Sequence, residues 1–151
     1  DGAVHHIRAD IRQLEAPLLR GFDAILCCET LEHIPFTAVP AVLAAFHDTG
    51  APYLVLSVPY AGPQIGLSLY LNPRVRPRLK YFHRFHFLHR FPLPRSNSWE
   101  HHRWEIGYRD YPLRKLVRVV EATGYRVLRR EFTSGTRSVF LVCERLAHAR
   151  A

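Results

Sequence analysis

Hydrophobic and polar positions along the first third of the chain follow strand-like and helix-like periods. Apolar runs at 3–9, 22–28 and 52–59 predict three β-strands, the last with the pattern of a strand covered on both faces. An apolar stripe at helical spacing separates the last two runs: Val39, Val42, Leu43 and Phe46. We expect Thr37 to cap that helix and Gly50 to end it. Strand, helix and strand with short connections predict a βαβ crossover with parallel strands.

The pattern resumes near the end of the chain. Leu113, Leu116, Val117 and Val120 form a second helical stripe, with Pro112 at the expected start and Gly124 at the expected end. The apolar runs at 125–132 and 137–146 then predict two strands in an antiparallel hairpin. The sequence therefore predicts an α/β fold whose sheet is mostly parallel, with one antiparallel strand inserted by the terminal hairpin.

The segment 60–104 between these halves is basic and aromatic. The 151-residue chain has a net charge of +8, yet no acidic residue lies between Asp48 and Glu100. Seven basic residues do: Arg74, Arg76, Arg78, Lys80, Arg84, Arg90 and Arg95. Such a segment attracts phosphate, an anionic membrane surface or an acidic substrate. Its apolar residues also allow an amphipathic helix on a membrane interface: Leu79, Phe82, Phe85, Leu88 and Phe91.

The candidate chemistry follows the strand at 22–28, in the sequence ETLEH. Glu29, Glu32 and His33 stand at spacings that share one face of a helical turn. Ligands of open α/β sheets bind beyond the carboxyl ends of the strands, so these side chains should reach a ligand cleft. Two carboxylates and an imidazole suit Mg²⁺ or Mn²⁺. Alternatively, His33 is a general base or a buried histidine held by Glu29.

Several of these stretches, in this order, resemble class I S-adenosylmethionine-dependent methyltransferases. RADI at 8–11, FDAILCCETLEHIP at 22–35, LVLSVP at 54–59 and HHRWEIGY at 101–108 carry the resemblance. It implies a Rossmann-like methyltransferase sheet and S-adenosylmethionine as cofactor.

The resemblance also implies roles for single residues. Asp10, Ile11 and Glu29 would contact the cofactor, and Ser57, Tyr60 and Trp104 would line the acceptor site. ETLEH resembles the metal-binding Glu-x-x-Glu-His of certain O-methyltransferases, and His102 in HRWE would be a fourth ligand beside Glu29, Glu32 and His33. Glu32 and His33 would be the catalytic pair. The segment 60–104 would form a lid over the substrate.

Two features depart from the family pattern. None of the eight glycines forms a GxG loop, and the chain has no Met. We expect residues 1–151 to be a partial domain that lacks the N-terminal strands and the Gly-rich loop. The predicted function is methylation, at oxygen, of a small, phosphorylated or otherwise anionic acceptor. The alternative is a non-catalytic domain that binds nucleic acid or anionic lipid through residues 74–95.

The three cysteines bear on the compartment of the protein. Cys27, Cys28 and Cys143 predict buried, reduced thiols and a cytoplasmic protein.

Overall fold

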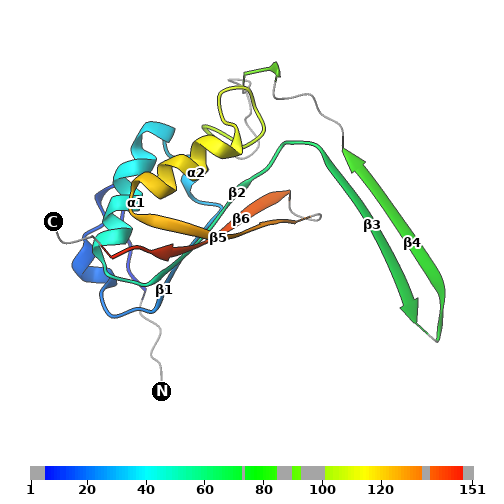
Figure 1. Cartoon of the computed structure of the whole chain (residues 1–151), viewed down its shortest axis with the longest axis horizontal. Helices are drawn as coiled ribbons and strands as arrows, with labels where there is room; N and C mark the ends of the chain where they lie inside the picture. Colours follow the sequence, from blue (N-terminus) through cyan, green and yellow to red (C-terminus); the bar gives the residue numbers. More distant parts are fainter. Residues whose placement is uncertain (1–5, 73, 85–89, 93–100, 134–136, 148–151) are drawn as a thin grey trace.

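The computed structural model describes residues 6–72, 74–84, 90–92, 101–133 and 137–147. Within them lie two helices and six strands in chain order: β1 Ala24–Cys28, α1 Val39–Asp48, β2 Tyr53–Pro59, β3 Gln64–Asn72, β4 Val75–Arg84, α2 Leu113–Ala122, β5 Tyr125–Phe132 and β6 Ser138–Arg145 (Figure 1). Four short 3₁₀ turns complete the description: Ile11–Gln13, Ala16–Leu19, Leu31–His33 and Phe36–Ala38.

Four strands form the main sheet, in the order β1-β2-β6-β5. β1 pairs with β2 in parallel, and β6 pairs antiparallel with both β2 and β5. Three strands thus run in one direction and β6 alone in the other, which confirms the predicted inserted hairpin. The predicted βαβ crossover is also confirmed, with α1 between the parallel strands.

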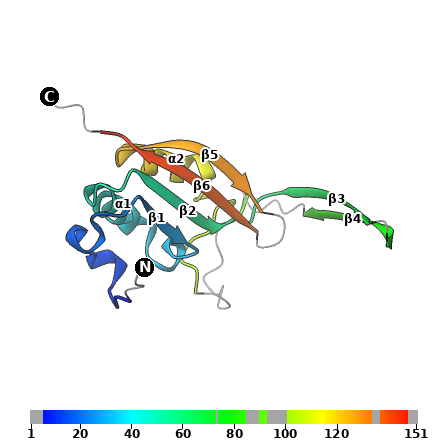
Figure 2. The same cartoon turned by 90° about the horizontal axis from the view of Figure 1, so that it is seen from below.

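One face of the sheet carries both helices, which contact each other (Figure 2). Alternate residues of the central strands are buried on this face in two cross-strand rows: Ile25, Leu54 and Cys143, then Cys27, Leu56 and Leu141. The opposite row of Leu26, Val55 and Val142 is open to solvent, with Leu26 72% exposed. The expectation that β2 is covered on both faces is therefore wrong for its first half, where Tyr53 is exposed, because both described helices pack on the same side. It is confirmed for its second half, where four successive residues are buried, from Leu56 to Pro59.

The helices largely match the predicted stripes. All four stripe residues of α1 are buried, and Pro40 lies in its first turn. Thr37 is not its N-cap, since a 3₁₀ turn leads directly into the helix and Ala38 occupies the cap position without a side-chain bond. Gly124 ends α2 at a φ of +90°, where a Cβ would meet the His47 ring at 2.8 Å.

One further strand prediction and one prediction of a buried cysteine need correction. The described part of 3–9 forms no strand, because a strand needs a neighbour for its backbone hydrogen bonds and β1 pairs only with β2 among the described residues. Cys28 is exposed although Cys27 and Cys143 are buried, because successive strand residues face opposite sides of the sheet. Burial raises the pKa of both the Cys27 and Cys143 thiols to about 12.

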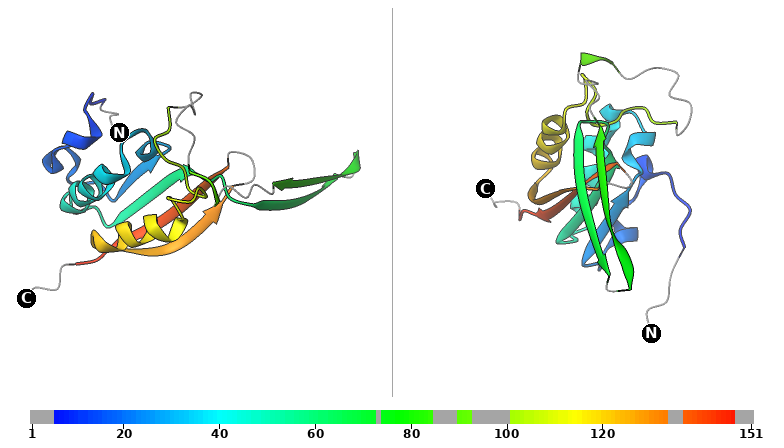
Figure 3. Two further views of the ribbon diagram at one scale, coloured as in Figure 1. Left: turned by 90° about the horizontal axis from the view of Figure 1, so that it is seen from above. Right: turned by 90° about the vertical axis from the view of Figure 1, so that its right-hand side faces the viewer.

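The basic segment contains a second, two-stranded sheet formed by β3 and β4. This hairpin extends away from the four-stranded sheet and both helices, as Figure 1, Figure 2 and the left view of Figure 3 show. The amphipathic helix considered for 79–91 is wrong for its described part in β4, where residues 75–84 are a strand, and 85–89 lie outside the described residues. The role of 60–104 as a lid stays a prediction.

Candidate functional site

A buried carboxylate lies at the carboxyl end of β1. The chain leaves Cys28 and forms a 3₁₀ turn, Leu31–His33, which turns Glu32 inward and leaves His33 46% exposed in its side chain. Glu32 is fully buried, and neither of its oxygens has a hydrogen-bond partner among the described residues. Burial raises the pKa of Glu32 to about 7, because a low-dielectric surrounding disfavours the charged form.

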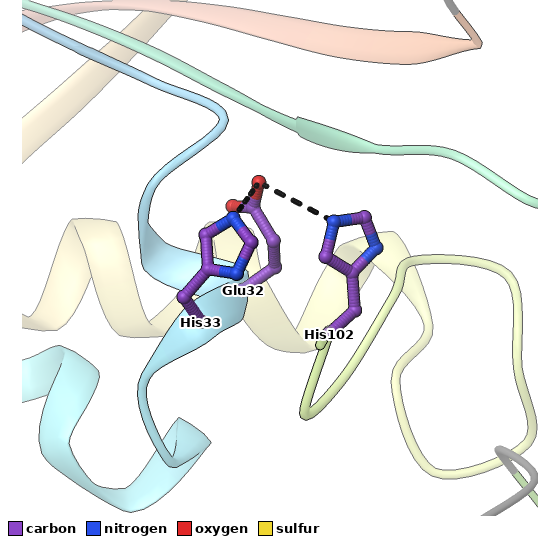
Figure 4. Close-up of side chains that lie close together, drawn as sticks. All are labelled: Glu32, His33 and His102. Atoms are coloured by element: carbon purple, nitrogen blue, oxygen red, sulfur yellow. Dashed lines mark ion pairs between the residues drawn. The ribbon is translucent and has the colours of Figure 1, made fainter. Parts of the chain in front are cut away.

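Two imidazoles face this carboxylate (Figure 4). Nε2 of His33 lies 3.7 Å and Nε2 of His102 lies 4.0 Å from the same oxygen, Oε1 of Glu32. The His33 and His102 rings meet edge-to-face with centroids 5.1 Å apart. Both distances are longer than a hydrogen bond. The three side chains therefore point toward a common region, and neither imidazole is hydrogen-bonded to Glu32 through Nε2.

His102 reaches this point through a loop fastened to the sheet. The N–H of Arg103 donates to the Glu32 carbonyl at 2.8 Å, and the N–H of Ile106 donates to the Pro59 carbonyl at 3.1 Å. Gly107, at a φ of +111°, passes so close to residue 62 that a Cβ would lie 2.5 Å from the Gly62 nitrogen. The loop therefore needs glycine at 107 to lie against the end of β2.

The orientation of the His102 ring is set by Glu105. Nδ1 of His102 lies 2.9 Å from Oε1 of Glu105, and both side chains are 6% exposed. Because a carboxylate accepts, Nδ1 carries the donated proton and Nε2 presents its lone pair toward Glu32. A carboxylate and a ring lone pair then face each other in a nearly dry site. That arrangement calls for a cation or a proton between them.

These three residues come close to the arrangement that a metal ion needs. Their ligand atoms lie within 4.8 Å of one another, whereas ligands held about 2.1 Å from one ion lie roughly 3–4 Å apart, so a bound ion would draw the side chains closer together. The nearly buried His102–Glu105 pair matches the carboxylate support that metal-bound histidines usually have. Glu29, expected as a further ligand, lies outside this group of three.

Glu29 is instead fastened to β2. Its N–H donates to the Ser57 carbonyl at 3.0 Å, and Ser57 Oγ donates to Oε1 of Glu29 at 2.7 Å. The backbone of Glu29 has a φ of +47°, which non-glycine residues rarely adopt. Such strain tends to occur at functional sites. Ser57, expected to line the acceptor site, is buried, and its hydroxyl donates to Glu29.

The remaining expected site residues lie in different surroundings. Trp104 is fully buried in the core, with Nε1 donating to the Ile34 carbonyl at 3.1 Å. The expectation that it touches substrate is therefore corrected: it supports the 3₁₀ turns after β1 from behind. Tyr60 does border a cavity of 410 Å³, whose other walls include Tyr108, Arg109 and Arg114.

The two residues expected to contact adenine, Asp10 and Ile11, precede β1 in the chain. Asp10 accepts from the N–H of Arg12 at 2.9 Å and pairs with its guanidinium, which holds the pKa of Asp10 down to about 2. Ile11 borders a largely apolar groove of 430 Å³ that runs along β1 past Phe22 and Thr30. No pattern in the sequence predicts this groove, because it depends on how residues 7–19 fold back beside β1.

Comparison with known proteins supports the fold. No protein-family model and no curated protein sequence matches the chain. Among solved structures, the 1,6-didemethyltoxoflavin-N1-methyltransferase of Burkholderia thailandensis, with 1,6-didemethyltoxoflavin and S-adenosylhomocysteine bound, has a TM-score of 0.51 at 14% identity. The match covers 93% of this chain and 50% of that one.

A second neighbour is the magnesium protoporphyrin IX methyltransferase of Synechocystis PCC 6803 with bound S-adenosylmethionine. It has a TM-score of 0.48 at 15% identity, over 91% of this chain and 43% of that one. This chain thus spans about half the length of the methyltransferases that it resembles. The first of the two likenesses shows the fold: the described sheet and helices are arranged as in the corresponding half of the Burkholderia thailandensis methyltransferase.

Proposed function

We propose that this chain takes part in S-adenosylmethionine-dependent methyl transfer to an oxygen atom of a small, anionic acceptor. The observation that carries the proposal is the convergence of Glu32, His33 and His102 at the carboxyl ends of two parallel strands. Ligands of open α/β sheets bind at this edge. The likeness in fold to a methyltransferase with bound S-adenosylhomocysteine supports the proposal that a ligand binds at this edge of the sheet.

We assign the cofactor to the side of β1 that carries the 430 Å³ groove. Its apolar wall at Ile11 suits the adenine ring, and Asp10 beside it offers carboxylate oxygens to a ring amino group. The strained backbone of Glu29 lies where the groove side meets the cluster of three, so its exposed carboxylate can accept from the cofactor's hydroxyl or amino groups.

His33 has the exposure that a reacting group needs. An acceptor hydroxyl oxygen attacks the sulfonium methyl carbon in line; the new carbon–oxygen bond forms as the carbon–sulfur bond breaks, and S-adenosylhomocysteine leaves. The hydroxyl proton passes to the His33 imidazole, and Glu32, whose Oε1 lies 3.7 Å from Nε2 of that ring, stabilises the imidazolium that results. The Tyr60 cavity, with Arg109 and Arg114 in its wall, offers cations to an anionic group of the acceptor.

A divalent metal is the second arrangement that the same residues support. Glu32, His33 and His102 would hold Mg²⁺ or Mn²⁺, and two imidazoles with one carboxylate favour Mn²⁺ of these two. When bound, such an ion lowers the pKa of an acceptor hydroxyl and orients it. His33 would then be a ligand and not the base, so a metal titration distinguishes the two roles.

The test compares two neighbouring histidines. We expect the protein to bind S-adenosylhomocysteine and to transfer labelled methyl to a carboxylated phenol. His33→Asn, Glu32→Gln and His102→Asn should each lower the rate about 100-fold or more, because they remove the base, the carboxylate beside it and the third member of the cluster. His101→Asn is the matched control: His101 is exposed and adjacent in sequence, and this variant should keep the rate.

Mn²⁺ binding is measured separately by calorimetry on the same variants. If Mn²⁺ binds and Glu32→Gln abolishes binding while His101→Asn does not, the three residues form the metal site. If Mn²⁺ does not bind, His33 acts as the base. Failure to bind S-adenosylhomocysteine would contradict the proposed function as a whole.

A further inference from the structure

The β3–β4 hairpin exposes a continuous apolar face. Alternate residues of β3 and their partners on β4 make up this hairpin face: Ile65, Leu67, Leu69, Leu71, Leu79 and Tyr81. Leu69 stands opposite Leu79, and Leu67 opposite Tyr81. Each of the six is between 59% and 73% exposed. Contiguous exposed apolar patches mark interaction sites, whereas single exposed apolar residues do not.

The hairpin also needs a partner on energetic grounds. A two-stranded ribbon with no covered face is at best marginally stable in water. The hairpin extends beyond the main sheet instead of packing on it (Figure 3). A two-stranded hairpin that extends away from the main sheet can place one whole face against another surface. Covering the hairpin face would therefore remove apolar area from water and stabilise both strands.

Charge selects the chemistry of that partner. The segment 49–99 that contains the hairpin has seven basic residues and no acidic one. A partner surface must therefore be anionic. A second copy of this chain fits poorly, because each copy has a net charge of +8 and the two copies would repel each other.

The composition of the hairpin face separates lipid from nucleic acid. Single-stranded nucleic acids stack their bases on aromatic rings. Five of the six apolar residues of the hairpin face are aliphatic. By register, Tyr81 and His83, which pairs with Ile65, are the ring-bearing residues on this side. Along β4 the basic residues alternate with Leu79 and Tyr81 and so belong to the opposite side of the ribbon. An element with one apolar and one basic side is what an anionic lipid interface accommodates, with apolar groups at the acyl boundary and basic groups near the headgroups.

We propose that the hairpin face docks on an anionic membrane surface. The protein would lie on the bilayer without crossing it: among the described residues, no helix has the length and apolar character that a membrane span requires. This inference does not depend on methyl transfer, and its test uses no cofactor.

The test is vesicle co-sedimentation of the whole protein. Vesicles of phosphatidylcholine with about one third phosphatidylglycerol supply the anionic surface, and vesicles of phosphatidylcholine alone are the neutral comparison. We expect binding at least about tenfold tighter to the anionic vesicles, and weaker binding when ionic strength rises from about 0.05 to 0.5 M. The double variant Leu67→Ser/Leu69→Ser should lose at least about tenfold in affinity.

Leu128→Ser is the matched control, because Leu128 is a 49% exposed leucine on β5, in the main sheet. It should bind anionic vesicles as the unaltered protein does, and thermal unfolding of both variants checks that the main sheet remains folded. Three results would overturn the proposal: equal vesicle binding by the double variant, a self-association that the double variant abolishes without vesicle binding, or tight oligouridylate binding in place of vesicle binding.

Discussion

The cluster after β1 and the β3–β4 hairpin depart from ordinary burial in opposite ways. At the cluster, Glu32 is a polar group without access to water. On the hairpin face, six large apolar residues have no cover. Buried polar groups and large exposed apolar patches are the two departures from ordinary burial that carry information. The difference teaches that one region is organised around a small ligand or ion and the other around an extended surface.

The two regions also differ in how they are held. The cluster depends on a loop that is hydrogen-bonded to the Glu32 and Pro59 carbonyls and on Trp104 behind it. The hairpin depends on the ladder between its own two strands. Substitutions should therefore have large effects on the stability of the first region and small effects on that of the second.

The largest expected effect is in the core beneath the cluster. Trp104→Ala removes a fully buried ring and its hydrogen bond to Ile34, so it should lower the free energy of unfolding by about 3–5 kcal/mol. Urea denaturation measures the change. A loss below about 1 kcal/mol would show that the ring is not packed as described.

The next effect tests the support of His102. Glu105→Gln keeps the shape of the side chain but removes the charge that accepts from Nδ1 at 2.9 Å. If Mn²⁺ binds, its affinity should fall about 10–100-fold, whereas the thermal midpoint should change little. Glu131→Gln, which alters an exposed carboxylate on β5, is the control and should leave the affinity unchanged.

The smallest effect is expected on the hairpin. Leu69→Ala replaces a side chain that is 59% exposed, so the free energy of unfolding should change by no more than about 0.5 kcal/mol without vesicles. A loss comparable to that of Trp104→Ala would mean that the hairpin face is covered by the protein itself, and the contrast between the two regions would disappear.

Local patterns predicted most of the main sheet correctly. The stripe of α1, the stripe of α2 and the terminal hairpin are each readable because helix and strand periods repeat over short distances. Sequence order also predicted Glu32 and His33 in the turn after β1, but the single face expected for Glu29, Glu32 and His33 is wrong, because Glu29 bonds to Ser57. The strand expected at 3–9 failed for its described part because strand formation depends on a distant partner and not on local sequence.

Residue types and spacing in the sequence thus determined the order of the elements and the polar residues that follow β1. Only the tertiary structure decided that Glu32 is buried while Glu29 bonds to Ser57, and that His102 faces Glu32 although the two are 70 positions apart in the sequence. It also decided that an apolar hairpin face stays in solvent. The physical reason is that burial and approach distance depend on which surfaces pack together, and local periodicity does not specify that packing.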